Sequence, residues 1–358
     1  MSPAVWVKWL TAINWRKVLI FVVSILLFTL SLELMKAGAR SLAPVISELL
    51  RVNGPTSGLG FGWLSAYLVM SGSPVAAAAL TFFDVGILDY HSAFAMITGS
   101  RLGASLVILM IGFLYVLRGH ERITSLTTGL LALTVTAATY LPALPVGYLL
   151  MDLTPLERLA GLQPPGALVS VFDMLFTPVV ALVMTLLPDW MTFLVGLGII
   201  VGSFNLFDRA LPELNLQESA FSDITRLLYR PVVTFGLGLL VTLLTMSVSV
   251  SLGLLVPLSV RGYIRRENLV PYIMGCNIST FIDTLVAGLL LRNAGAAVIV
   301  LAQMLSVMVV STVILLFFFG PFERGVLRLT TWLTDRQGRL LGFLALILII
   351  PLMLLFVR

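Results

Sequence analysis

Residues 68–73 read Leu68-Val-Met-Ser-Gly-Ser73, and residues 244–249, 176 positions later, read Leu244-Thr-Met-Ser-Val-Ser249. The same shift, without a gap, matches identical residues across the longer segments 65–99 and 241–275: Leu68, Met70, Ser71, Ser73, Gly86, Ile97 and Gly99 meet Leu244, Met246, Ser247, Ser249, Gly262, Ile273 and Gly275. Leucine and isoleucine recur freely in an apolar background, but serine and glycine in one register are harder to obtain by chance. We therefore interpret the two segments as copies of one repeat.

The composition is that of a membrane protein. Of the 358 residues, 59% are hydrophobic and 11% are charged, and the mean hydropathy is +1.06, whereas soluble domains have about a quarter charged residues. Several apolar runs reach or approach the roughly 20 residues that cross a bilayer core. They are residues 18–34, 93–117, 123–141, 167–187, 191–207, 231–260, 268–291, 296–319 and 340–357. We expect a polytopic, all-α protein whose first run is a retained helix, because no signal-peptide cleavage site follows it.

The charged and sulfur-containing residues argue against several function classes. The net charge of +5 arises from Lys and Arg between the apolar runs, where a positive-inside bias explains them, so no nucleic-acid partner is expected. The single Cys276 excludes an internal disulfide, and no cluster indicates a metal or another cofactor. Nothing resembles a nucleophile–base pair, so we do not expect an enzyme. Lys8, Arg16 and Lys17 predict a cytoplasmic N-terminus, and the short loops favour a prokaryotic inner membrane.

The repeat divides the chain into residues 1–165 and 166–358. The first half would also contain the first span and an amphipathic interfacial helix over residues 36–53, and the second would end in a C-terminal membrane helix. The loops of the two copies differ in charge: the first contains Asp84, Asp89 and His91, and the second contains Arg261, Arg265, Arg266 and Glu267. Opposite loop charges indicate an inverted repeat. A simple count of spans gives parallel copies, so inversion requires an extra crossing within the proline-rich residues 140–166.

Each serine pair predicts a re-entrant helical hairpin. Pro74 disfavours helix at Ser73 and removes a backbone donor, and backbone opened at bilayer depth must be satisfied by protein or line a wet cavity. The hairpin tip would present hydroxyls, carbonyls and helix N-termini, which suit an anion or Na⁺. The alternative is that serine and glycine only permit close helix packing. Agreement between two copies favours the first interpretation.

The second arm of each copy, residues 99–105 and 275–284, predicts a broken transmembrane helix, although Gly-x-x-x-Gly as at Gly99–Gly103 also suits helix contact. Each arm carries an intramembrane charge, and such charges usually face a cavity or a partner. Arg101 can neutralise an anion, and Asp283 can hold Na⁺ or relay a proton. Both are expected to face one central cavity, or they form a structural ion pair. Asp173 is a weaker third candidate.

These segments resemble the sodium–phosphate cotransporter family (PNaS, or type II), whose repeats contain Gln-Ser-Ser-Ser followed by Gly-x-Asn-Ile-Gly-Thr-Thr. The corresponding segments here are Met70-Ser-Gly-Ser73, Met246-Ser-Val-Ser249, Gly99-Ser-Arg-Leu-Gly-Ala-Ser105 and Gly275-Cys-Asn-Ile-Ser-Thr-Phe281. Residues 27–38 also look like the first helix of the family, and the resemblance spans most of residues 20–320. Methionine replaces both glutamines, Arg101 stands at an Asn position, and Asp283 stands at a Thr position. The fold and transporter class therefore carry over better than the substrate.

The residues and the resemblance together imply a secondary active transporter, with sodium-coupled symport of phosphate or a related small anion by alternating access. The expected binding residues are Ser71, Ser73, Arg101, Ser105, Ser247, Ser249, Asn277, Thr280 and Asp283. Na⁺, the expected coupling ion, is assigned to Ser73, Ser249 and Asp283. Two alternatives stay open: a membrane scaffold or sensor that has lost transport, and a proton-coupled carrier of another solute.

Overall fold

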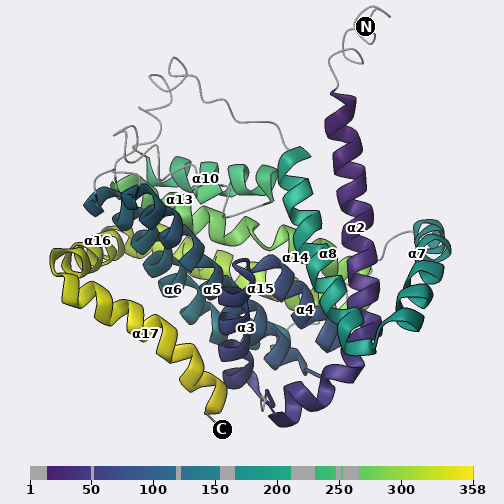
Figure 1. Ribbon diagram of the computed structural model, residues 1–358. Coiled ribbons are helices and arrows are strands. Elements are labelled where there is room, and N and C mark those ends of the chain that lie inside the picture. The colour runs from purple at the N-terminus through teal and green to yellow at the C-terminus, as the bar shows by residue number, and fades with distance from the viewer. Residues whose placement is uncertain are drawn as a thin grey trace, which may run out of the picture.

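The computed structural model describes residues 14–49, 52–117, 122–153, 166–210, 230–246, 251–252 and 266–357, and in these ranges every regular element is helical. In chain order the elements are α2 (Trp15–Ala39), η1 (Arg40–Leu42), η2 (Val45–Leu49), α3 (Pro55–Val69), α4 (Ser73–Asp84), α5 (Tyr90–Leu117), α6 (Arg122–Leu153), α7 (Gly166–Leu186), α8 (Asp189–Ala210), α10 (Pro231–Thr245), α13 (Arg266–Ser279), α14 (Ile282–Leu290), α15 (Ala294–Val313), η4 (Ile314–Phe318), α16 (Phe319–Asp335) and α17 (Gln337–Phe356). The helices form one bundle, with α17 along one edge and α2 and α7 on the opposite side (Figure 1).

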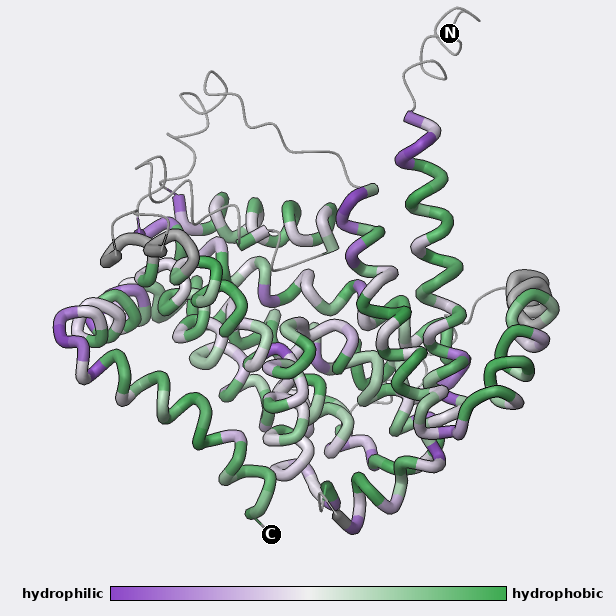
Figure 2. The backbone as a smooth tube through the Cα atoms, viewed as in Figure 1, coloured by the Kyte–Doolittle hydropathy of each residue, from purple (hydrophilic) through white to green (hydrophobic). Residues whose placement is uncertain are grey.

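Seven helical stretches within the described residues are long and apolar enough to cross a membrane. They are Trp15–Leu42, Tyr90–Phe113, Leu126–Leu153, Asp189–Ala210, Arg266–Leu290, Ala294–Asp335 and Gln337–Phe356. Hydrophobic residues dominate the tube along most of these helices, and hydrophilic residues gather near their ends (Figure 2). The predicted all-helical chain with several membrane-spanning helices is therefore confirmed.

The first membrane helix, α2, packs antiparallel against α8. A Cβ on Gly38, near the end of α2, would lie 2.3 Å from the carbonyl oxygen of Asp189 at the start of α8, so only glycine permits this approach. At the other end of the pair, the rings of Phe21 and Phe207 lie 5.1 Å apart. Of the predicted interfacial helix over residues 36–53, residues 36–39 form the last turn of α2, and helical backbone continues through η1 and η2 to Leu49. Its location at the membrane interface stays a prediction.

Helices α3, α4 and α5 form the centre of the bundle. Every residue of α4 from Pro74 to Phe82 is buried, and its run of four alanines lets neighbouring helices approach from all sides. Helix α5 packs against α3 through glycines on both helices. A Cβ on Gly99 would lie 2.0 Å from the carbonyl oxygen of Leu59, and one on Gly62 would lie 2.0 Å from that of Met96. Backbone contact between these helices therefore requires glycine.

Helices α10 and α13 repeat this packing 176 positions later. Helix α10 begins and ends at the positions that correspond to the ends of α3, and α13 begins where the shift places the start of α5. A Cβ on Gly275 would lie 2.1 Å from the carbonyl oxygen of Phe235, and one on Gly238 would lie 2.1 Å from that of Tyr272. Each of these contacts is the counterpart, at the same shift, of a glycine contact between α3 and α5.

The prediction of a broken helix is wrong for the first copy. Helix α5 runs without interruption from Tyr90 to Leu117, because Gly99 and Gly103 serve close packing against α3 rather than unwinding. In the second copy the chain does break, between the end of α13 at Ser279 and the start of α14 at Ile282. The two copies therefore share their packing but differ in the continuity of the second arm.

The proline-containing region at the end of α6 also differs from expectation. Helix α6 continues through Pro142 and Pro145 to Leu153, so residues 140–153 form no separate crossing; residues 154–165 lie outside the described part.

The two halves of the chain, residues 1–165 and 166–358, pack on each other. For example, the hydroxyl of Tyr67 on α3 donates to the carbonyl oxygen of Ile347 on α17 at 2.8 Å.

Candidate functional site

The serine-containing turn between α3 and α4 begins after a left-handed residue and ends at a proline-containing helix start. Met70 ends α3 in the left-handed region with φ 55°, and α4 begins at Ser73, with Pro74 in its first turn. A Cβ on Gly72 would lie 2.8 Å from the carbonyl oxygen of Ser100, so the turn packs directly on α5. Met246 ends α10 in the same way with φ 48°, whereas Ser247 and Ser249 lie outside the described residues.

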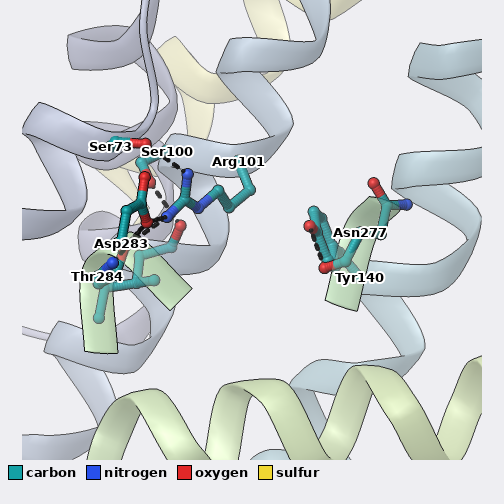
Figure 3. A network of polar contacts seen from close by, with 8 residues as sticks. Ser73, Ser100, Arg101, Tyr140, Asn277, Asp283 and Thr284 are labelled. Carbon is teal, nitrogen blue, oxygen red and sulfur yellow. Dashed lines mark hydrogen bonds and ion pairs between the residues drawn. The ribbon is translucent and has the colours of Figure 1, made fainter. Parts of the chain in front are cut away.

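Arg101 extends from α5 to this turn and to the second copy of the repeat. Its Nη1 donates to the Ser73 hydroxyl at 3.0 Å, and its Nη2 forms an ion pair with Asp283 Oδ1 at 3.0 Å and also donates to the Thr284 hydroxyl. The side chains of Arg101 and Asp283 are 5% and 1% exposed. Figure 3 shows Arg101 reaching toward Ser73, Asp283 and Thr284. The predicted alternative of an ion pair between the two charges is therefore what the structure contains.

Asp283 is held by its own helix as well as by Arg101. It lies in the first turn of α14, where the helix dipole favours a carboxylate. Its Oδ1 accepts hydrogen bonds from the hydroxyl of Thr284 at 2.8 Å and from the Thr284 backbone N–H. The break between α13 and α14 thus creates a helix N-terminus beside Arg101.

The ion pair leaves one polar atom of each partner without a hydrogen bond. Arg101 Nε and Asp283 Oδ2 are both buried and have no partner among the described residues. The guanidinium carbon of Arg101 lies 5.0 Å from the centre of the Phe281 ring, which provides a cation–π contact but no acceptor. Each charged group therefore retains hydrogen-bonding capacity that its partner does not use.

A cavity of about 50 Å³ lies beside Arg101, with room for a few water molecules or a small ion. Six of the nine expected binding residues line it: Ser71, Ser73, Arg101, Ser105, Asn277 and Thr280. Arg101 and Asn277 are equivalent positions of the two copies, as are Ala104 and Thr280, which also line the cavity. Residues related by the repeat thus meet across one space.

Helix α6 contributes cavity residues that the sequence analysis missed, Thr136 and Tyr140. The Tyr140 hydroxyl donates to the backbone carbonyl of Asn277 at 2.9 Å, and the Thr136 hydroxyl donates to Asn277 Oδ1 at 3.3 Å. Asn277 Nδ2 in turn donates to the Thr139 hydroxyl at 3.1 Å. Figure 3 shows Tyr140 and Asn277 as a pair separate from the Arg101 cluster. The sequence signal that could have identified Thr136 and Tyr140 is their spacing of four positions, which places two polar side chains on one face of an apolar helix.

Asp283 does not face the cavity beside Arg101, contrary to the prediction. It lines a second cavity of about 190 Å³ between α2, α8, α14 and the end of α10. The wall of this second cavity is mostly aromatic and aliphatic, with Phe28, Phe204 and Val286 among its residues. The ion pair therefore connects the wall of a polar cavity to the wall of an apolar one.

Ser105 and Asp173 contribute less to this geometry. The Ser105 hydroxyl donates to the carbonyl oxygen of Leu102 at 2.6 Å, which leaves its lone pairs for the cavity. Asp173 lies in α7, but its side chain is outside the described part. Among the described residues, no group of three or more His, Cys, Asp and Glu side chains is placed to hold a metal ion. A Na⁺ site here would depend on hydroxyl and carbonyl oxygens with a single carboxylate.

The seven candidate spans and the helical fold define an integral, multi-pass membrane protein. No protein-family model, curated protein or solved structure matches the chain. The function must therefore be argued from the cavity and its residues.

Proposed function

We propose that the protein is a secondary active transporter that couples Na⁺ to the uptake of phosphate or a related small anion by alternating access. The observation that carries the proposal is the cavity beside Arg101, where equivalent positions of the two copies meet the Ser71–Ser73 turn. A buried guanidinium with an unused N–H, surrounded by hydroxyl and amide groups, suits an oxyanion. The resemblance to the sodium–phosphate cotransporter family makes phosphate the first substrate to test.

Helix lengths support a re-entrant hairpin in the first copy, and α10 of the second copy is as short as α3. Helices α3 and α4 contain 15 and 12 residues, and α10 contains 15. At about 1.5 Å per residue these helices are roughly 18–23 Å long, less than the roughly 30 Å of a hydrocarbon core. Chain reversal at Ser71–Ser73 then lies inside the membrane, in contact with the intramembrane Arg101. Irregular backbone is tolerated at that depth where it lines a cavity.

Loop charges support the inversion of the two copies. The loop of the first copy contains Asp84 and Asp89, whereas the loop of the second contains Arg261, Arg265 and Arg266. Because basic loops stay in the cytoplasm, corresponding loops of opposite charge are expected on opposite sides of the membrane. Inverted repeats that meet at a midplane site are a common basis of alternating access.

Two other functions also have specific support. The charge of Arg101 is already neutralised by Asp283, and the cavity beside it is small. Both features are consistent with a scaffold or sensor that transports nothing. The buried Asp283 Oδ2, which has no hydrogen-bond partner within the described ranges, suits a proton-coupled carrier of another solute. We favour anion symport because the polar groups converge around Arg101 rather than around Asp283.

Uptake of labelled phosphate into proteoliposomes separates the three functions. Symport predicts accumulation that requires an inward Na⁺ gradient and is lost in Arg101→Ala. Accumulation driven by a proton gradient alone indicates the proton-coupled carrier, and no accumulation under either gradient indicates the scaffold. Asp84→Asn is the matched control, because Asp84 is a buried carboxylate paired with Lys36 at 2.7 Å on the far end of α4 from Ser73.

A further inference from the structure

The Arg101–Asp283 ion pair joins the polar cavity to a carboxylate whose Oδ2 has no hydrogen-bond partner in the described part of the chain. Arg101 lines the polar cavity, and Asp283 lines the apolar cavity on the other side of the pair. Both side chains are almost fully buried. A charge that enters the polar cavity therefore acts on Asp283 through Arg101, and a charge beside Asp283 acts on Arg101.

An anion that enters the polar cavity competes with Asp283 for the same cation. Arg101 is the charged donor among the residues that line this cavity, and its Nη2 is occupied by Asp283 and Thr284. With the carboxylate in place, a bound anion would add a second negative charge to a buried site that has one positive charge. Excess buried charge is strongly unfavourable, so anion binding requires either departure of the carboxylate or its neutralisation.

Asp283 is built to lose Arg101 without losing all its partners. The Thr284 hydroxyl and backbone N–H would still donate to Oδ1, and the start of α14 would still favour a negative charge. Its Oδ2 is buried without a hydrogen-bond partner among the described residues, so it is available to a small cation. A monovalent cation at Oδ2 would restore neutrality once an anion has taken over Arg101.

We propose that Asp283 and the substrate anion exchange places on Arg101, and that Na⁺ binding at Asp283 is what permits the exchange. This inference rests on the proposed function and specifies how its two fluxes are coupled. In the absence of substrate, the ion pair keeps the site closed and neutral. With both solutes bound, Arg101 holds the anion and Asp283 holds Na⁺, so neither solute binds well alone.

Binding of labelled inorganic phosphate to the purified protein, in NaCl or in choline chloride at fixed pH and ionic strength, tests the exchange. For the wild type we expect the Kd to be about tenfold lower in NaCl, within the usual range of coupling between sites. Asp283→Asn keeps an acceptor for the Thr284 donors but removes the charge. We expect this variant to bind phosphate tightly in both salts, with a ratio of Kd values near one. Asp84→Asn should keep the wild-type ratio.

The outcomes separate this inference from the proposed function. Phosphate binding by the wild type in neither salt would overturn both. A wild-type protein that depends on Na⁺, together with an Asp283→Asn variant that keeps the same ratio of Kd values, would overturn the exchange alone. A folded Asp283→Asn variant that binds no phosphate would also overturn the exchange, because the carboxylate would then only position Arg101.

If Asp283→Asn does not fold, the neutral double variant Arg101→Gln/Asp283→Asn replaces it, since it leaves no buried charge unpaired. The exchange predicts that this variant binds no phosphate and that its melting temperature no longer responds to Na⁺. Retained phosphate binding with the wild-type Na⁺ dependence would overturn the inference.

Discussion

Arg101 Nη2 lies 3.0 Å from Asp283 Oδ1, although the two residues are 182 positions apart and belong to different copies of the repeat. The pair is buried on both sides. Such a pair gives little net stability relative to apolar residues, but removal of one partner leaves an uncompensated charge. Stability alone therefore does not explain its presence at the junction of the copies, and the proposed binding of an anion by Arg101 would explain it.

A double-mutant cycle on this pair separates charge balance from packing. We expect Asp283→Ala to lower the free energy of unfolding by about 3–5 kcal/mol, because it leaves the Arg101 charge unpaired. Arg101→Ala should fall at the lower end of this range, because Thr284 still donates to Asp283. The double variant should recover most of the loss. Unfolding in mixed detergent micelles measures all four proteins, and additive losses would contradict a direct pair.

Sequence reasoning identified Arg101 and Asp283 because charged residues inside apolar runs are rare. It left open whether they pair, since pairing depends on where α14 begins, and that start is set by tertiary contacts. Tyr140 and Thr136 were missed because they lie in the apolar run of residues 123–141, which carries no copy of the repeat. Gln303, whose amide nitrogen Nε2 donates to the buried Thr98 hydroxyl at 3.0 Å, also lies within an apolar run, and the sequence reasoning did not identify it.

The glycines explain why one element was predicted wrongly. In both copies glycine in the second arm was interpreted as a site of helix unwinding, but Gly99 and Gly275 bring two helices into backbone contact. Glycine serves both purposes, and the sequence contains no signal that separates them. The start of α10, in contrast, follows from Pro231 at its first turn, as Pro55 does for α3.

Alanine at the packing glycines tests whether the two copies are equivalent. In Gly99→Ala and Gly275→Ala the new methyl group would meet a backbone carbonyl oxygen at 2.0 and 2.1 Å, so the helices must separate. We expect each change to lower the free energy of unfolding by about 1–3 kcal/mol or more. Gly198→Ala, which meets nothing within 4 Å in α8, is the control and should be neutral or slightly stabilising. A large loss at only one glycine would argue against equivalent packing.

Met70, the left-handed residue at the end of α3, is a position where glycine is expected to raise the free energy of unfolding. Met70 has φ 55° and is 40% exposed, so its backbone conformation is unfavourable and its side chain gains little packing to offset this. Met70→Gly should raise the free energy of unfolding by about 1 kcal/mol, and Met70→Val should lower it, because β-branched residues fit this region poorly. Thermal unfolding of the two variants beside the wild type measures the difference. Equal stabilities of Gly and Val at this position would contradict the assigned backbone conformation.

Substitution of Arg101 tests its role in anion binding. We expect Arg101→Ala to weaken phosphate binding by about 10- to 100-fold, the amount that corresponds to loss of a charged hydrogen bond. Arg101→Lys should restore binding only in part, because ammonium lacks the planar fork that pairs two oxygens at once. Equilibrium binding of labelled phosphate measures both. Full rescue by Lys would show that charge alone is recognised, and unchanged binding in Arg101→Ala would exclude the residue from the site.

The orientation of the two copies can be measured with single cysteines. Gly54 and Arg230 immediately precede α3 and α10, are 176 positions apart, and correspond to each other in the two copies. A Cβ on Gly54 meets nothing within 4 Å and Arg230 is exposed, so cysteine is tolerated at both. The native Cys276 is buried and is replaced by serine to leave one thiol in each protein. If the copies are inverted, a membrane-impermeant maleimide added to sealed vesicles of one orientation labels only one of the two cysteines. Permeabilised vesicles supply the total for each variant. Labelling of both cysteines from the same side would show parallel copies and would remove the structural basis for alternating access.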